Sequence, residues 1–157
     1  MKDGELELRQ FAPTLEVAAT YFAGAEKDRI KLVCARFNSA KDVYEWLKPY
    51  GDNKRLYGIF VKGENAGFVG LANRSTKAAR KIEMLYYLLK KFEGFGHMSR
   101  AFKMLERELF GKLGIEKIII TFAEGNKRSL NTAMRNGYKI ESAFRDGNEI
   151  FYRAGKT

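Results

Sequence analysis

Residues 90–102 read KKFEGFGHMSRAF, a basic turn with two glycines that leads directly into helical periodicity. From Met98 to Leu109 the apolar residues recur on one helical face, which predicts a helix that starts near Gly96 and ends around Gly111. A glycine turn before a helix can direct backbone N–H groups and the positive helix end toward an anion such as phosphate. Ordinary strand-to-helix loops also have this composition, so the pattern of the neighbouring segments is needed to decide between an anion-binding turn and an ordinary loop.

The segments on both sides of the turn alternate between strand and helix patterns. KIEMLYYLL at 81–89 and EKIIITFAE at 116–124 are strongly apolar strands, and NKRSLNTAMRN at 126–136 is a short helix with Leu130, Ala133 and Met134 facing inward. Strands separated by a helix tend to be parallel and hairpins are antiparallel, which predicts an α/β (α+β) domain with a mixed sheet. The other predicted elements are a strand at 5–9, helices after Pro13 and from the capping residue Ser39, a hairpin within 55–74 around KGEN, and a last hairpin formed by 138–144 and 148–154. Residues 23–38 lack a clear period and are interpreted as a loop or a short irregular helix.

Composition predicts one domain over residues 1–157, since 45% of the 157 residues are apolar. No apolar run approaches the length of a membrane span, and the first residues are polar, so we expect a cytoplasmic protein that does not enter a membrane. The single Cys34 cannot form an internal disulfide, and no metal site is predicted. The net charge is +10, and residues 74–112 carry 10 Lys/Arg against 4 Asp/Glu. More than half of the basic excess therefore surrounds the glycine turn, where it favours an anionic partner such as a phosphorylated ligand or a nucleic acid.

This order of elements resembles the GNAT superfamily of acyl-CoA-dependent N-acetyltransferases. The phosphate turn of that family reads Gln/Arg-x-x-Gly-x-Gly/Ala, and residues 93–98 read Glu-Gly-Phe-Gly-His-Met in that place, with Glu93 and Met98 departing from the pattern. A second family motif, Asn-x-x-Ser followed by a basic residue and x-Gly-Phe/Tyr, is present at 126–138. The chain most closely resembles the Rim-type ribosomal-protein N-terminal acetyltransferases, whose strand Glu-Leu-Gly-Tyr-Trp-Leu is similar to residues 83–88 with Leu85 in place of glycine.

The resemblance implies a GNAT fold with about four helices and a mixed sheet of about seven strands, splayed between the fourth and the fifth strands. It also implies that acetyl-CoA is the co-substrate. In the family, the pantetheine arm of the coenzyme lies in the splay, pairs with the fourth strand and contacts the Asn-x-x-Ser motif, while the turn holds the pyrophosphate. The residues that the resemblance assigns to the coenzyme are Leu85, Tyr86, Leu88, Glu93, Gly94, Phe95, Gly96, His97, Met98, Asn126 and Ser129.

The catalytic candidates are Glu83 and Ser129. Glu83, on the strand that should line the cleft, can accept the proton of the attacking amine, or it can be a strand-edge carboxylate paired with a neighbouring basic residue, Lys81 or Arg80. Ser129 can hydrogen-bond the departing thiolate. Asn126 can hold the pantetheine or cap its helix. Many relatives have a tyrosine acid on this helix where the chain has Ala133, so Tyr87 and Tyr138 are considered as substitutes, although both suit a core. His97 should face the phosphates or the solvent.

These assignments predict an enzyme that transfers an acetyl group from acetyl-CoA to a primary amine by direct attack. The acceptor stays open between a protein N-terminus, a polyamine and an amino sugar, and residues 23–38 and 144–149 should determine it. The alternative functions are a basic nucleic-acid-binding module and an acyl-CoA-binding protein without turnover, both on the same scaffold. We expect a monomer or a homodimer.

Overall fold

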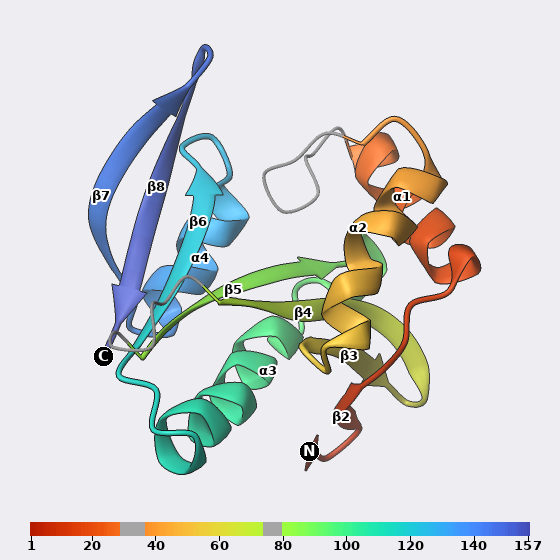
Figure 1. Cartoon of the computed structure of the whole chain (residues 1–157), viewed down its shortest axis with the longest axis horizontal. Coiled ribbons are helices and arrows are strands. Elements are labelled where there is room, and N and C mark those ends of the chain that lie inside the picture. Colours follow the sequence, from red (N-terminus) through yellow and green to blue (C-terminus); the bar gives the residue numbers. More distant parts are fainter. Residues whose placement is uncertain (29–36, 74–79) are drawn as a thin grey trace. The chain divides into compact units, whose positions relative to one another are not determined.

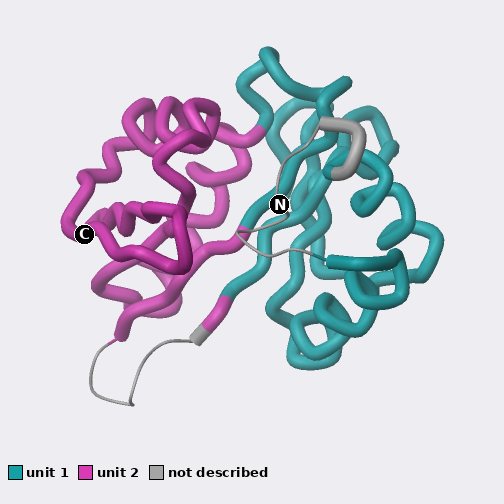
Figure 2. Tube along the Cα trace, turned by 90° about the horizontal axis from the view of Figure 1, so that it is seen from above, with its two compact units in different colours: residues 1–71, 86–97 teal, residues 72–85, 98–157 magenta. Residues whose placement is uncertain are grey.

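A computed structural model describes residues 1–28, 37–73 and 80–157 of the chain. These residues form two compact units, which Figure 2 shows in different colours. Unit 1 contains residues 1–71 and 86–97, and unit 2 contains residues 72–85 and 98–157. The single domain expected for residues 1–157 stays a prediction.

Within the described residues, eight strands form one mixed sheet in the order β1-β2-β3-β4-β5-β6-β8-β7. About seven were predicted, and the additional one is the two-residue β1. Its pairing with β2 is antiparallel, as is that of β2 with β3 and of β3 with β4, whereas β5 and β6 are parallel. The bounds of the strands are Lys2–Asp3 (β1), Leu6–Gln10 (β2), Leu56–Val61 (β3), Glu64–Asn73 (β4), Lys81–Leu88 (β5), Lys117–Ala123 (β6), Lys139–Asp146 (β7) and Glu149–Lys156 (β8).

In unit 1, two helices pack beside each other, α1 (Leu15–Asp28) and α2 (Ala40–Asp52) (Figure 1). Ser39 caps α2 by accepting a hydrogen bond from the Asp42 N–H at 3.2 Å, as predicted. The β3–β4 hairpin turns at Lys62 and Gly63, which both have a positive φ, and this confirms the predicted hairpin. The core of the unit contains Ala18, Tyr21, Ala25, Val43, Leu47, Leu56, Phe68 and Tyr87.

One prediction in unit 1 needs a correction. Residues 23–28 continue α1, although their pattern was interpreted as a loop or an irregular helix. The apolar face of α1 carries small alanines and tyrosine rather than a run of leucines, and Ala25 is buried with Ala18 and Tyr21. Small residues weaken the periodic signal without weakening the packing. Residues 29–36 of the predicted loop lie outside the described part of the chain.

In unit 2, the helix predicted at 96–111 is α3 (His97–Glu106, of which His97 belongs to unit 1) followed by a π-helical segment at Arg107–Lys112. The short helix is α4 (Lys127–Arg135), and it contacts β6. Alternate residues of β6, namely Ile118, Ile120 and Phe122, are at most 2% exposed. Met134 was predicted to face inward and is 46% exposed, because only one narrow stripe of this nine-residue helix is buried, at Ala133.

The parallel pairing of β5 and β6 is short. It joins Lys81 with Lys117, Ile82 with Ile118 and Glu83 with Ile119, all in unit 2. The pairing therefore begins where the two strands begin and stops at Glu83. These are the fourth and fifth strands of the sequence prediction, which expected them to separate.

Candidate active site

The glycine turn lies between a single 3-10 turn at Lys90–Phe92 and the start of α3 at His97. Gly94 and Gly96 have φ values of 84° and 75°, which L-residues with a side chain rarely adopt. Residues 94–96 are exposed. The first N–H groups of a helix have no partner within it and carry the positive end of the helix dipole. The turn thus has the backbone geometry and the exposure that an anion site requires.

The side chains around the turn differ in what they can contribute. Phe95 is 68% exposed, and its ring stacks on that of His97 with the centroids 5.6 Å apart. Met98 is 8% exposed on the buried face of α3, so only its backbone can contact a ligand. Glu93 has an extended backbone, and its N–H donates to the Lys90 carbonyl oxygen at 3.0 Å.

Glu83 is a buried carboxylate in unit 2, with 3% of its surface exposed. Its Oε1 accepts a hydrogen bond of 2.9 Å from the Thr121 hydroxyl on β6. Arg80, one of the two basic partners considered for Glu83, forms an ion pair of 3.9 Å with Glu116. Thr121 was not among the predicted site residues. The available signal was that it is the only hydroxyl side chain in a strand that is otherwise apolar apart from its first residue.

The motif at the start of α4 forms a helix cap. Asn126 is the N-cap residue, and its Oδ1 accepts from the backbone N–H of Ser129 at 3.2 Å. The capping interpretation of Asn126 is therefore confirmed, and its assignment to the coenzyme stays a prediction. Both side chains lie in the first turn of the helix and are partly buried.

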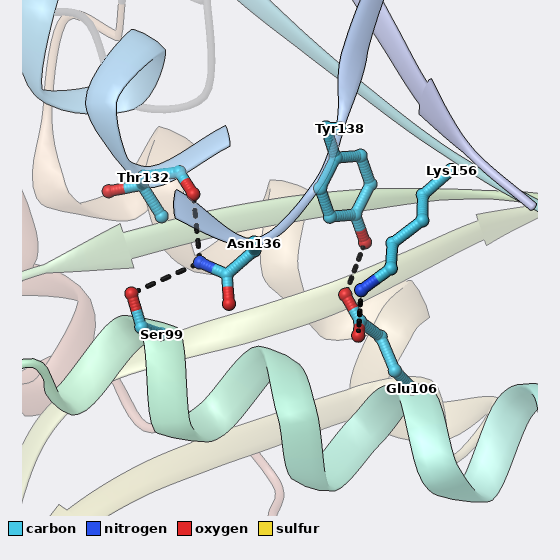
Figure 3. Close-up of polar contacts among 6 residues, drawn as sticks. All are labelled: Ser99, Glu106, Thr132, Asn136, Tyr138 and Lys156. Carbon is cyan, nitrogen blue, oxygen red and sulfur yellow. Dashed lines mark hydrogen bonds and ion pairs between the residues drawn. The ribbon is translucent and has the colours of Figure 1, made fainter. Parts of the chain in front are cut away.

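The two tyrosines considered as acids are core residues. Tyr87 is 5% exposed in the aromatic cluster of unit 1, with its ring 5.7 Å from that of Tyr21. Tyr138 is 2% exposed in unit 2 and donates its O–H to Glu106 Oε1 at 2.9 Å. Glu106 Oε2 also pairs with Lys156 Nζ at 2.7 Å, so this tyrosine belongs to a buried polar cluster (Figure 3).

A second polar contact in unit 2 joins the end of α4 to the beginning of α3. Asn136, the residue before Gly137 in the second motif, donates its Nδ2 to Ser99 Oγ on α3 at 3.0 Å and to the Thr132 carbonyl oxygen at 2.8 Å (Figure 3). The C-terminal end of α4 is thereby attached to the first turn of α3. Ser99 was not among the predicted site residues.

The described residues form a mixed α/β fold with a glycine turn at the start of a helix, and the sequence matches the acetyltransferase (GNAT) domain over residues 5–139. The chain belongs to this family, as the motifs predicted. It is 32% identical over 104 residues to YdaF of Bacillus subtilis (strain 168), a proposed ribosomal N-acetyltransferase. That match covers 66% of this chain and 56% of the relative, so the chain spans only a little over half of the relative's length.

Solved structures show the same fold. An acetyltransferase from Salmonella typhimurium that modifies the N-terminal serine of ribosomal protein L7/L12 has a TM-score of 0.81 at 18% identity, over 98% of this chain and 95% of that one. The microcin C7 self-immunity acetyltransferase MccE, solved with acetyl-CoA and AMP, has a TM-score of 0.75 at 22% identity, over 98% and 93% of the two chains. At these identities the likeness concerns the fold, which confirms the predicted GNAT architecture.

Two further findings concern only the described residues. None of their helices is long and apolar enough to cross a membrane. They contain no group of three or more His, Cys, Asp and Glu side chains that could hold a metal ion. The cytoplasmic location and the absence of a metal stay predictions.

Proposed function

We propose that this chain is an N-acetyltransferase that moves an acetyl group from acetyl-CoA to a primary amine. Membership of the GNAT family supports the reaction class. The observation that carries the proposal is the turn at 93–98, where two exposed glycines with positive φ directly precede a helix. Such a turn suits the pyrophosphate of coenzyme A, which needs close N–H donors and a positive helix end.

The other coenzyme contacts are proposed on the resemblance to the family. The backbone groups of Leu85, Tyr86 and Leu88 would pair with the pantetheine amides, and one N–H would polarise the thioester carbonyl. Asn126 would contact the pantetheine through its amide nitrogen, because its Oδ1 already caps α4. The proposed pantetheine contacts are therefore made by backbone groups of β5 and by one side-chain nitrogen, that of Asn126.

In the proposed reaction, the amine nitrogen attacks the thioester carbonyl carbon and the carbon–sulfur bond breaks, so the sulfur leaves as a thiolate. The proton of the amine passes to the Glu83 carboxylate, directly or through water. The Ser129 hydroxyl donates a hydrogen bond to the thiolate, which is finally protonated from solvent. No covalent enzyme intermediate is needed, because positioning of the two substrates supplies a large part of the rate.

The acceptor that we favour is the N-terminal amine of a ribosomal protein. The names of YdaF and of the Salmonella acetyltransferase support this class. A polyamine and an amino sugar are the alternatives within the same chemistry. A basic nucleic-acid-binding module stays the rival from another class, motivated by the net charge of +10. A cytoplasmic monomer or homodimer is the expected state.

Titration calorimetry with acetyl-CoA and with a short RNA tests the proposed class. We expect acetyl-CoA to bind and the RNA not to bind in physiological salt. In Gly96→Val the affinity for acetyl-CoA should fall by about tenfold or more, about 1.4 kcal/mol, because a β-branched residue resists φ near 75° and the turn must change its path. An added Cβ at Gly96 meets no atom within 4 Å, so the fold itself should be retained.

Gly63→Val is the matched control for that experiment. Gly63 has φ 81° and an equally open Cβ position, but it lies in the β3–β4 turn. Both variants should lose similar stability, and only Gly96→Val should lose coenzyme affinity. Binding of acetyl-CoA to Gly96→Val at the parent's affinity would mean that the pyrophosphate lies elsewhere, and tight binding of RNA alone would favour the rival function.

Asn126 and Ser129 should have separate effects. Asn126→Ser keeps a capping oxygen and removes the amide, so it should weaken acetyl-CoA binding with little change in stability, whereas Asn126→Ala should also cost about 1 kcal/mol of folding free energy. Ser129→Ala should lower kcat with acetyl-CoA saturating, while its backbone N–H still donates to the cap. Unchanged turnover in Ser129→Ala on the true acceptor would remove this hydroxyl from the mechanism.

A further inference from the structure

Three strands of unit 2, β5, β6 and β8, present polar groups on one face of the sheet. Residues that pair across neighbouring strands point to the same face, as do residues two apart along a strand. Glu83 pairs with Ile119, and Thr121 follows two residues later on β6. Thr121 pairs with Arg153 of β8. The face that carries the Glu83–Thr121 hydrogen bond therefore also carries Arg153.

The guanidinium of Arg153 lies over an aromatic ring. Its guanidinium carbon lies 4.6 Å from the ring centroid of Phe144, which β7 presents on the same face. Phe144 in turn stacks on Phe151, with the centroids 5.4 Å apart and the planes at 18°. A cation over a ring face is attracted by the ring electrons, and this contact does not use the N–H donors of the guanidinium.

The charge of Arg153 has no acidic partner among the described residues. Its Nε is buried and donates to no acceptor there. Two lysines of unit 2 have close carboxylate partners, since Lys117 pairs with Glu141 at 2.5 Å and Lys156 pairs with Glu106 at 2.7 Å. A buried donor without an acceptor costs on the order of 1–3 kcal/mol, and native proteins have few of them. An arginine that lies over a ring and has no acceptor within the described residues can donate its N–H groups to the oxyanion of a ligand.

The role proposed here for Arg153 rests on the proposed acetyltransferase function. Glu83 is the proposed base on β5, and Arg153 lies on β8, with β6 between them. Strands are spaced by about 4.8 Å and rise about 3.3 Å per residue, and Arg153 lies two residues farther along β6 than Glu83, so the two backbones lie roughly 12 Å apart. We propose that Arg153 binds a carboxylate or phosphate of the acceptor, a few bonds from the amine that loses its proton to Glu83. In a peptide acceptor, this distance corresponds to an acidic side chain within the first three or so residues.

Matched pairs of acceptors test the proposal. The peptides Ser-Asp-Ala-Ala and Ser-Ala-Asp-Ala, as C-terminal amides, are each compared with the peptide that has Asn in place of Asp. Phosphoethanolamine is compared with ethanolamine. Two quantities are measured for each probe: kcat/KM with acetyl-CoA saturating, and Kd in the presence of coenzyme A, which needs no turnover. The parent protein should prefer the acidic member of at least one pair by about tenfold, and the pair that shows it identifies the oxyanion.

The preference should disappear in Arg153→Gln and persist in part in Arg153→Lys, which keeps the charge without the planar fork. Arg107→Gln is the control, because it removes one exposed charge of the same unit. Thermal unfolding shows whether each variant is folded, and Arg153→Lys keeps the test usable if Arg153→Gln is not. Equal losses on both members of a pair, or an Arg107→Gln effect as large as that of Arg153→Gln, would overturn the proposal.

The experiments distinguish a wrong role for Arg153 from a wrong proposed function. A parent protein that acetylates or binds the neutral probes as well as the acidic ones contradicts the role of Arg153 and leaves the acetyltransferase proposal intact. A protein that binds acetyl-CoA but none of the anionic probes also contradicts the role of Arg153. Absence of acetyl-CoA binding in calorimetry contradicts both.

Discussion

Replacing Lys156 by methionine is expected to lower the free energy of unfolding by about 3 kcal/mol, because it leaves a buried carboxylate without its ion pair. Glu106 is 7% exposed and contacts Lys156 at 2.7 Å and the Tyr138 hydroxyl at 2.9 Å (Figure 3). In the variant only the neutral hydroxyl donates to Glu106. This expected loss lies at the lower end of the range for buried ion pairs, because the Lys156 side chain is 29% exposed and water can reach part of the Glu106 carboxylate in the variant.

Urea denaturation at neutral pH measures this loss. The matched control is Lys112→Met, whose partner Glu108 lies at 2.9 Å on the surface, with the two side chains 74% and 30% exposed. An exposed pair of this kind contributes about 0–1 kcal/mol. The double variant Glu106→Leu/Lys156→Met should recover much of the lost stability, because it removes both charges together. A loss in Lys156→Met no larger than that in Lys112→Met would contradict the importance of the cluster.

The elements that could be predicted from the sequence are those whose signal is local. The glycine turn, the Ser39 cap and the β3–β4 hairpin each depend on a few adjacent residues, and the structure confirms all three. The end of α1 was missed because alanine packs closely against the core while giving little periodicity. Met134 was misassigned because a nine-residue helix has too few turns to define its buried stripe from the pattern alone.

The contacts of the candidate site that were missed depend on strand register. Glu83 and Thr121 are 38 residues apart, and Arg153 reaches Phe144 through the β7–β8 pairing, which contains a bulge between Ile140 and Ser142. A shift by one residue would turn each side chain to the opposite face, and no local pattern fixes that choice. Polar residues within apolar strands, such as Glu83 and Thr121, were the only available signal.

Glu83→Gln is expected to lower kcat by roughly 10²–10⁴ with acetyl-CoA saturating, the usual effect of losing a general base. Glutamine keeps the size of the side chain, and its carbonyl oxygen can still accept the Thr121 hydroxyl, so the strand contact should be retained. Glutamine cannot take up a proton from the amine. The matched control is His97→Gln, at a residue that stacks on Phe95 in the glycine turn and should change the KM for acetyl-CoA more than kcat.

The pH dependence alone does not identify the base. An amine acceptor is mostly protonated at neutral pH, so the rate at low acceptor concentration should rise toward about pH 8 to 9 whichever group removes the proton. The comparison at saturating acetyl-CoA and saturating acceptor does distinguish the two residues, because kcat then reports the step after binding. High turnover in Glu83→Gln together with low turnover in His97→Gln would move the chemistry to the glycine turn, and the acceptor face that includes Arg153 would lose its rationale with it.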